Sequence, residues 1–313
     1  MTMTSKLLST ILEHRLPDSS GPISFQRIPT GKFNESFFVE VGSRELVLRI
    51  APPRDSVFVF YERDMMRQEP AIHKLLLAKT QVPVAPILCF DDSLTLLDRD
   101  FLIMERLPGK PLAEASRLPY DRVLRQVGDC LSQTHGQTAS SYGYLGKHRP
   151  MDPQARWVDA FHIMWNKMIE DIVCVGQYDQ EEELFLRCLL DKHLIFFDRN
   201  MPSSLLHMDI WHQNILVDKQ GHLTGIVDWD RALWGDPEIE FAVLDYCGIS
   251  EPSFWEGYGK ERDLSPEARI RQVFYLLYEL QKYIVIRQGR GKDPLGARRY
   301  KDQVMGIVRQ YFS

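Results

Sequence analysis

The sequence has little of what marks a disulfide-rich, metal-cluster or membrane protein. Its 313 residues include five cysteines that lie far apart and form no C-x-x-C pair, so we expect reduced cysteines in the core. No apolar run approaches the roughly 18 residues of a membrane span. The first fifteen residues have one short, interrupted apolar stretch and no signal-peptide pattern. From these features we expect a cytoplasmic protein.

An excess of positive charge is also missing. The chain has 38 basic and 43 acidic residues and a formal net charge of -5, so it offers no global field for nucleic acid or an anionic membrane, and we expect neither as a partner. The composition, 44% hydrophobic and 26% charged, is that of a globular protein. The length indicates one large unit or two lobes.

The first third of the chain has the alternating pattern of β-strands. FFVEV and ELVLRI form a predicted hairpin with Gly42 in the turn. VPVAPILCF and DFLIMERL are two further predicted strands, and a helix is expected in the second half of 57–79. We therefore predict a sheet of about five strands with one helix, ending at the Leu107-Pro108-Gly109 break.

After Gly109 the pattern becomes mainly helical, with only ILV and GIV, around 215–217 and 225–227, resembling strands. We predict an α+β fold with an N-terminal lobe, residues 1–107, a C-terminal lobe, residues 108–313, and a hinge near 107–109. The expected helices of the second lobe span 119–138, 153–175, 180–199, 237–247 and 266–288.

A set of polar residues interrupts the apolar runs of the second lobe. His207-x-Asp209-x-x-x-x-Asn214 has the spacing of the kinase catalytic loop, and Asp228 ends an apolar run fourteen residues after Asn214. A lone aspartate after a strand is more often a cap or turn former. The three residues together, in this order, indicate a phosphoryl-transfer site, because one amide oxygen and one carboxylate suffice for a magnesium ion that keeps several waters.

The stretch LLHMDIWHQNILVD, followed by GIVDWDRALWGDPEIEFA, resembles the aminoglycoside phosphotransferase-like branch of the protein-kinase-like fold, which also includes choline, homoserine, fructosamine and macrolide kinases. The resemblance covers roughly residues 23 to 247. It implies two lobes, a small antiparallel β-sheet lobe with one main helix and a larger, mostly helical lobe. It also implies ATP or GTP as donor, Mg²⁺ as cofactor and a hydroxyl of a small molecule as acceptor.

By the same resemblance, Asp209 is the catalytic residue that orients or deprotonates the acceptor hydroxyl, and Asn214 and Asp228 hold the metal. His207 is expected to hydrogen-bond the backbone. The nucleotide-binding residues are expected in the phosphate loop, on the following strand and helix, and in the hinge: Gly31, Lys32, Asn34, Ser36, Arg49, Glu69, Glu105 and Leu107.

The chain departs from the family pattern at several of these positions. Met208 and Trp211 replace the usual glycine and second histidine of the loop. Arg49 stands where kinases carry a phosphate-binding lysine, which exchanges a point charge for a planar fork. Its expected partner is Glu69. Glu62 is the alternative, because Pro70 leaves open where the helix begins and therefore which glutamate faces Arg49. The phosphate loop has Gly31 but no G-x-G-x-x-G run.

Other functions and other roles stay open at this point. Gly235 follows Asp228 by only seven positions, which argues against the long activation segment of a protein kinase. A non-catalytic nucleotide-binding scaffold remains an alternative because of Arg49. The acceptor and the oligomeric state are open. Several groups of residues have two interpretations. Asp230 and Asp236 brace the turn, or Asp230 contacts the metal. The cluster Asp179, Glu181, Glu182 and Glu183 starts a helix or binds a cationic substrate, and Trp157, Trp165 and Trp211 belong to the core or line an acceptor pocket.

Overall fold

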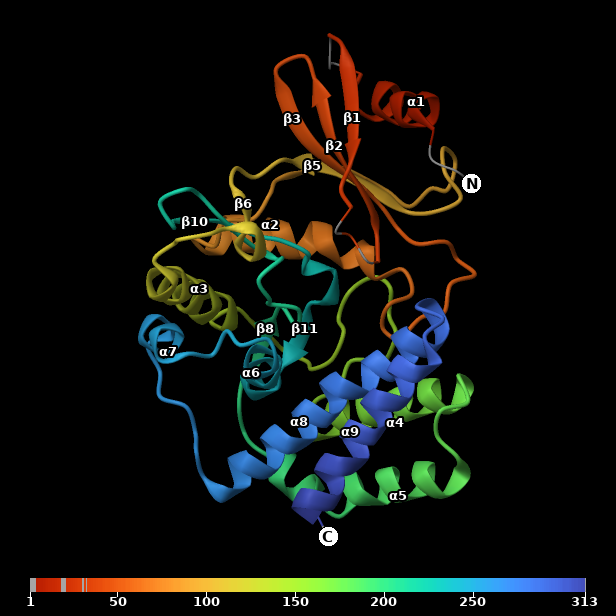
Figure 1. Ribbon diagram of the computed structural model, residues 1–313, viewed down its shortest axis with the longest axis vertical. Helices are drawn as coiled ribbons and strands as arrows, with labels where there is room; N and C mark the ends of the chain where they lie inside the picture. The colour runs from red at the N-terminus through yellow and green to blue at the C-terminus, as the bar shows by residue number, and fades with distance from the viewer. Residues whose placement is uncertain (1–3, 18–20, 30, 32, 313) are drawn as a thin grey trace.

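The computed structural model describes residues 4–17, 21–29, 31 and 33–312. It confirms the predicted α+β class, with an antiparallel sheet at the N-terminal end of the chain and a larger helical part below it (Figure 1). Of the helices in these residues, none has both the length and the apolar character that crossing a bilayer demands. The expectation that the cysteines lie in the core is wrong for Cys174 and Cys188, which are exposed.

The N-terminal sheet has five strands in the order β1-β2-β3-β5-β4, and every neighbouring pair is antiparallel. Gly42 has φ 60°, the left-handed conformation that the predicted hairpin turn favours. The strands are β1 (Ile23–Arg27), β2 (Glu35–Val41), β3 (Arg44–Ile50), β4 (Ile87–Asp91) and β5 (Phe101–Glu105).

Each face of this sheet packs against a helix. Helix α1 (Ser5–Arg15) buries Leu8, Ile11 and Leu12 against alternate residues of β2 and β3. Helix α2 (Glu69–Lys79) follows a 3-10 turn at Met65–Gln68 and tolerates Pro70 because the proline lies in its first turn. Helix α2 confirms the helix predicted in the second half of 57–79, and α1 is a helix that the sequence prediction did not include.

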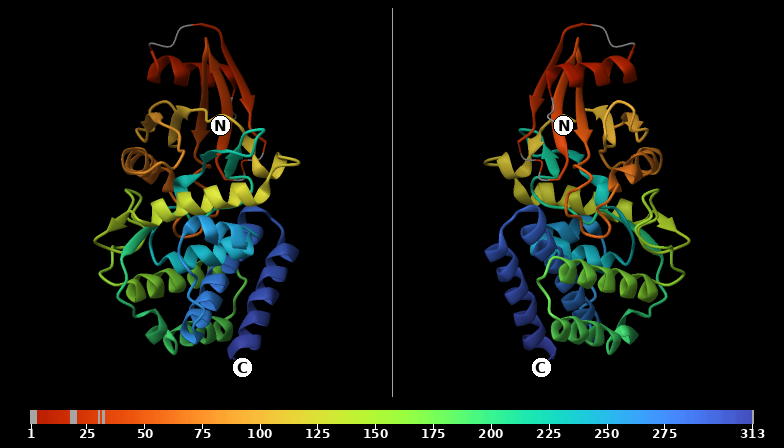
Figure 2. Two further views of the ribbon diagram at one scale, coloured as in Figure 1. Left: turned by 90° about the vertical axis from the view of Figure 1, so that its left-hand side faces the viewer. Right: turned by 90° about the vertical axis from the view of Figure 1, so that its right-hand side faces the viewer.

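The helical part contains all five predicted helices together with two that were not predicted, α7 and α9. Figure 2 shows α9 along the outer side of this part, packed on α8. Helix α5 ends before the predicted position 199 because a separate 3-10 turn, Leu194–Phe197, follows it. The helices are α3 (Tyr120–His135), α4 (Trp157–Cys174), α5 (Gln180–Asp191), α6 (Pro237–Tyr246), α7 (Pro252–Tyr258), α8 (Pro266–Val285) and α9 (Pro294–Phe312).

Six short strands lie among these helices and carry the loops of the site. Strands β6 (Lys110–Pro111), β9 (Ile215–Val217) and β10 (Leu223–Ile226) form one sheet. A second sheet contains β7 (Thr138–Ala139), β8 (Ser203–Leu206) and β11 (Leu233–Gly235). Only β9 and β10 were predicted. These two pair with each other across a short loop, whereas the other four pair with segments further away along the chain.

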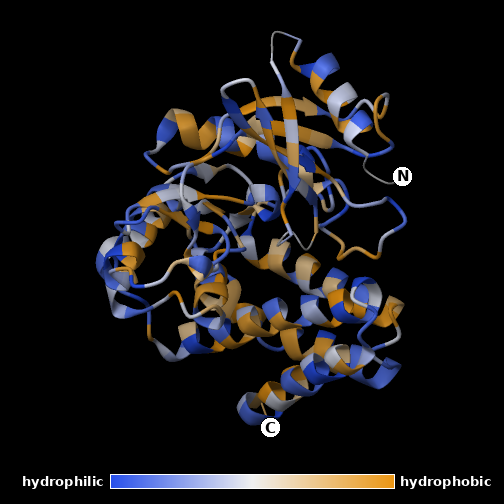
Figure 3. Cartoon of the chain, turned by 45° about the horizontal axis from the view of Figure 1, so that its top comes forward, coloured by the Kyte–Doolittle hydropathy of each residue, from blue (hydrophilic) through white to orange (hydrophobic). Residues whose placement is uncertain are grey.

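The core of the helical part is aromatic. Trp157, Phe161 and Trp165 on α4 are fully buried against α8, including Phe274 and Tyr275. The hydropathy colouring shows the same separation of apolar inner and polar outer helix faces (Figure 3). Trp157 and Trp165 are thus core residues, which leaves the acceptor-pocket interpretation without support.

The two parts meet in the segment between β5 and β6. Gly109 has φ +96°, and a Cβ there would lie 2.6 Å from the carbonyl oxygen of Val217, so the chain passes close over β9. The hydroxyl of Thr224 also donates to the carbonyl of Pro108 at 2.6 Å. We propose the lobe boundary at 107/108, where the chain leaves the N-terminal sheet.

Candidate active site

The loop after β8 is shaped by one buried histidine and one buried carboxylate. The Nε2 atom of His207 donates to the carbonyl of Val227 at 3.0 Å, and its Nδ1 accepts from the backbone N–H of Asp209 at 3.2 Å. The Glu240 carboxylate on α6 accepts from the backbone N–H groups of His207 and Met208. Met208 has φ 67° in the position of the family glycine, so these bonds hold a backbone conformation that non-glycine residues rarely adopt.

The same loop places Asn214 against Asp209. The Asn214 amide nitrogen donates to the backbone carbonyl of Asp209 at 2.9 Å and to its Oδ2 at 3.0 Å. With the amide nitrogen bound in this way, the amide oxygen is the Asn214 atom that can serve as a metal ligand. The backbone N–H of Val227 donates to the Asn214 carbonyl at 3.0 Å, which brings the segment ending in Asp228 beside this loop.

Asp209 is surrounded by positive charge. Its Oδ1 accepts from Arg231 at 3.1 Å and lies 3.9 Å from the Lys282 ammonium. Burial by itself would raise the pKa of Asp209, but Lys282 and Arg231 outweigh it and hold the pKa below its usual value. The side chain is 29% exposed, so an ionised carboxylate is open to a molecule that approaches from solvent.

On the donor side, one guanidinium contacts three carboxylates. Arg49 on β3 is buried and contacts Glu69 at 2.5 Å, Asp228, and Asp230 at 3.0 Å. Burial opposes the charge of Arg49, but the three carboxylates raise its pKa. The Asn34 amide nitrogen also donates to Asp230 at 2.9 Å, so Asp230 joins the phosphate loop to this cluster.

Negative charge exceeds positive charge in this cluster. Burial raises the pKa of Glu69 to about 7 in spite of Arg49, and burial together with Asp228 raises the pKa of Asp230. The Asp228 side chain is 37% exposed and its backbone is left-handed, with φ 72°. Two buried acids beside a partly exposed one would be stabilised by a further cation, and this chemistry fits Mg²⁺ at Asp228 and Asn214.

The phosphate-loop residues lie near this cluster as far as the structure describes them. Ser36 pairs with Arg49 across β2 and β3. A Cβ on Gly31 would lie 2.9 Å from the carbonyl oxygen of Asn34, which indicates a tight turn. Lys32 lies outside the described residues. A cavity of 270 Å³ adjoins the loop and is lined by Arg27, Ile28, Pro29, Gly31, Asn34 and Glu35.

The hinge residues follow the last strand of the N-terminal sheet. Glu105 ends β5, and its backbone N–H donates to the carbonyl of Pro86 at 3.0 Å. Leu107 lies against Gly225 of β10. A Cβ added to Gly225 would lie 2.7 Å from the Cδ1 atom of Leu107. The hinge thus lies between the N-terminal sheet and the strands that carry Asn214 and Asp228.

Glu62, the alternative partner of Arg49, has a different contact. It forms a two-pronged ion pair with Arg290, with distances of 2.9 and 3.1 Å. Arg290 belongs to the π-helical turn Ile286–Arg290 after α8, and its guanidinium stacks on Phe33 at 4.8 Å. Of these two glutamates, Arg49 therefore contacts Glu69, and Glu62 joins the first lobe to the second.

Three acids of the cluster at the start of α5, Asp179, Glu182 and Glu183, have partners within the protein. Asp179 caps the helix by accepting from the backbone N–H of Glu182 at 2.9 Å. Glu182 pairs with Lys301 at 2.7 Å and Glu183 with Arg187 at 2.9 Å. These contacts support the helix-start interpretation over a cationic substrate site.

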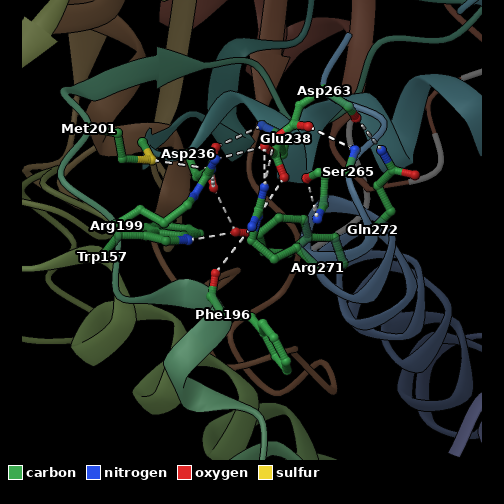
Figure 4. A network of polar contacts seen from close by, with 12 residues as sticks. Trp157, Phe196, Arg199, Met201, Asp236, Glu238, Asp263, Ser265, Arg271 and Gln272 are labelled. Carbon is green, nitrogen blue, oxygen red and sulfur yellow. Dashed lines mark hydrogen bonds and ion pairs between the residues drawn. The ribbon is translucent and has the colours of Figure 1, made fainter.

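Asp236 braces the segment that follows Asp228, as predicted. It accepts from the backbone N–H of Glu238 at 3.0 Å and from the hydroxyl of Tyr275 at 2.9 Å. Arg199 and Arg271 both contact Glu238 in the same network (Figure 4). The short turn between Asp228 and α6 is held on the body of the helical part.

Three charged residues near Asp209 were missed at the sequence level: Arg231, Glu279 and Lys282. Arg231 lies three residues after Asp228. Glu279 and Lys282 lie on the buried face of α8. The available signal was a pair of opposite charges within an apolar helix face, which a search based on the family motif does not detect.

Comparison with known proteins places the chain among phosphotransferases. A family model described as "Phosphotransferase enzyme family" matches residues 24–271. Hygromycin-B 4-O-kinase of Escherichia coli is 24% identical over 305 residues, which are 90% of this chain and 81% of that protein. A protein of Vibrio parahaemolyticus named "Probable ketoamine kinase" is 33% identical over 258 residues, 79% of this chain and 77% of the relative.

A solved structure confirms the predicted fold. A thermostable mutant of aminoglycoside phosphotransferase APH(4)-Ia, in a ternary complex with AMP-PNP and hygromycin B, is similar with a TM-score of 0.67. The sequence identity is 19%, and the match covers 96% of this chain and 99% of the other. At this identity the likeness shows a shared fold.

Proposed function

This chain belongs to the phosphotransferase enzyme family, and from that premise we propose that it transfers the γ-phosphoryl group of ATP or GTP to a hydroxyl of a small molecule. The observation that carries the proposal is the joint placement of Asp209, Asn214 and Asp228. Asp209 and Asn214 share a hydrogen bond, Val227 ties the Asp228 segment to Asn214, and Arg49 contacts Asp228. Phosphoryl transfer depends mainly on such positioning and charge control.

For the nucleotide, we propose that the phosphates are surrounded by Gly31, Lys32, Asn34 and Ser36. Arg49, anchored by Glu69, would neutralise the phosphates. The backbone of Glu105 and Leu107 would face the base. Asn214 and Asp228 would hold Mg²⁺, which supplies charge neutralisation of the phosphates when bound. The AMP-PNP in the APH(4)-Ia complex supports an adenine nucleotide as one donor.

Asp209 has the position and charge to handle the acceptor. Its lowered pKa keeps the carboxylate ionised at neutral pH, so it accepts a hydrogen bond from an acceptor hydroxyl and directs the oxygen toward the γ-phosphorus. A weakly basic carboxylate takes up the proton late, as bond formation proceeds, which matches a loose transition state. Asp209 is thus primarily an orienting residue in this proposal.

The acceptor class follows from the short segment after Asp228. Helix α6 begins at Pro237, so the segment is too short to dock a polypeptide in the way of a protein kinase. Hygromycin B and ketoamines are the acceptors that the names of the two relatives indicate for those proteins. We propose a hydroxyl of a small, polyhydroxylated molecule as the acceptor of this chain.

A non-catalytic nucleotide-binding scaffold is the second candidate, because Arg49 contacts the proposed metal ligand Asp228. Thermal midpoints with ATP, GTP or neither, each with and without Mg²⁺, test the donor site. A ligand bound only to the folded state, at a hundredfold excess over Kd, stabilises it by about 2.7 kcal/mol. We expect a Mg²⁺-dependent rise that is lost in Asp228→Ala. No rise with either nucleotide would contradict the donor site.

A further inference from the structure

A closed ring of four alternating charges lies behind the acceptor side of the site. Asp209 Oδ1 contacts Arg231 at 3.1 Å, and Arg231 contacts Glu279 at 3.2 Å. Glu279 pairs with Lys282, and the Lys282 ammonium returns to Asp209 Oδ1 at 3.9 Å. Each charge therefore has two neighbours of opposite sign, and the ring joins the catalytic loop to α8.

Three members of the ring are almost completely removed from solvent. The exposed fractions of the side chains are 7% for Arg231, 2% for Glu279 and 4% for Lys282, against 29% for Asp209. Burying charges is costly, and well-packed apolar residues often stabilise a fold as well or better. Stability alone gives no reason to place Glu279 and Lys282 on the buried face of α8.

The ring also determines how the Asp209 carboxylate is turned. Its Oδ1 faces Arg231 and Lys282, and its Oδ2 accepts from Asn214 at 3.0 Å. Rotation of the carboxylate would break contacts at both oxygens. Because α8 is packed against α4, α6 and α9, the ring anchors this orientation on a rigid element.

We propose that Glu279 and Lys282 are positioning residues for phosphoryl transfer. Glu279 acts through Arg231 and Lys282 acts directly on Asp209, and together they hold its carboxylate in the orientation that receives the acceptor hydroxyl. This inference rests on the proposed function. Both residues lie beyond 24–271, the span that the family model matches, so they extend the site past the residues that the family pattern identifies.

The test compares variants of Lys282 in the intact protein with Mg²⁺ and ATP or GTP. The acceptors are hygromycin B, a ketoamine and water, the last measured as nucleotide hydrolysis. Misplacing a reacting group by about 1 Å can cost roughly a hundredfold in rate, so we expect Lys282→Met to lower kcat by roughly tenfold to a hundredfold. The KM for nucleotide should stay unchanged, and Lys282→Arg should restore most of kcat.

Two controls separate positioning from stability. Lys301→Met removes another lysine paired with a glutamate, Glu182, and should leave kcat unchanged. Glu279→Gln keeps the shape of the side chain but breaks the alternation of charge, and it should lower kcat in the same way as Lys282→Met. If Lys282→Met does not fold, the kcat of Glu279→Gln tests the positioning role in its place.

The outcomes distinguish this inference from the proposed function. If Asp209→Asn loses transfer while Lys282→Met and Glu279→Gln keep the wild-type kcat, the positioning role is wrong and the proposed function stands. If Lys282→Met and Lys282→Arg lose activity only in proportion to a lowered thermal midpoint, the ring is structural and the inference fails. Full transfer by Asp209→Asn overturns the proposed function itself.

Discussion

At the scale of single residues, the proposed donor side depends on the geometry of Arg49. A planar guanidinium presents several N–H donors in a fixed fork, and here it contacts Glu69, Asp228 and Asp230 at once. A lysine ammonium at the same position would be a point charge that reaches fewer of them. The expected site has two carboxylates here, the partner of the cation and a metal ligand, which correspond to Glu69 and Asp228. Asp230 is a third, and the fork of an arginine can contact all three.

We expect Arg49→Met to lower the free energy of unfolding by about 3–5 kcal/mol, because it leaves buried carboxylates without a counter-charge. Arg49→Lys should lose less, since it keeps the charge. Urea unfolding at pH 7.5 measures both values. The exposed Arg156, which pairs with Asp159, provides the control, and Arg156→Met should match the wild type. Equal stability of Arg49→Met and the wild type would contradict the account of this cluster.

Residue spacing predicted which of the proposed site residues lie close together. The distances along the chain between Asp209, Asn214 and Asp228 are short, and local backbone geometry brings such residues together, as the hydrogen bond between Asp209 and Asn214 shows. Lys282 could not be found in this way, because it approaches Asp209 from a helix 73 residues further along the sequence. Its role depends on tertiary packing of α8, which spacing does not encode.

At the scale of elements, α2 carries both Glu69 and a buried histidine. The Nδ1 atom of His73 donates to the carbonyl of Ala85 at 2.7 Å, and its Nε2 lies 3.7 Å from the Glu69 carboxylate that Arg49 contacts. Burial lowers the pKa of His73 to about 4. The helix is therefore anchored by a neutral imidazole to the segment that leads into β4.

This anchor should make stability depend on pH. The folded-state pKa of about 4 lies below the ordinary value of 6.5, so the unfolded chain binds a proton more readily than the folded one. Stability from this group is present above pH 6.5 and is lost as the pH falls toward 4. Between pH 7.5 and 5.0 we expect His73 to account for up to about 2 kcal/mol of lost stability.

The measurement is urea unfolding of the wild type and His73→Gln at both pH values. The variant should lose less stability on acidification than the wild type, and the exposed His14→Gln should behave as the wild type does. If the stability of His73→Gln depends on pH as that of the wild type does, protonation of His73 is not the cause of the loss of stability at low pH.

Apolar residues at helical spacing predicted five helices of the second lobe, α3, α4, α5, α6 and α8. Length alone did not decide the outcome, because α9 has 19 residues and was not predicted. The short strands β7 and β11 form only because β8 lies between them, and no local pattern reveals such pairing. Helix α1 was missed because its apolar face consists of few residues, Leu8, Ile11 and Leu12.

At the scale of the whole molecule, the two parts of the chain contribute different halves of the proposed site. The sheet supplies Arg49 and the expected phosphate loop, α2 supplies Glu69, and the helical part supplies Asp209, Asn214 and Asp228. Composition and the change from alternating to helical patterns predicted this division. The strand order β1-β2-β3-β5-β4 and the contact of Arg290 with Glu62 join distant segments and became visible only in the structure.

The central claim is that this assembled site moves a phosphoryl group to a small hydroxyl acceptor. The most direct test follows a γ-phosphate label from Mg²⁺-bound ATP or GTP into hygromycin B, a ketoamine and a panel of other polyhydroxylated molecules. We predict labelled product with at least one acceptor, and loss of most turnover in Asp209→Asn with nucleotide binding retained. A protein that binds Mg²⁺-nucleotide but labels none of these acceptors, or an Asp209→Asn variant with wild-type turnover, would contradict the account.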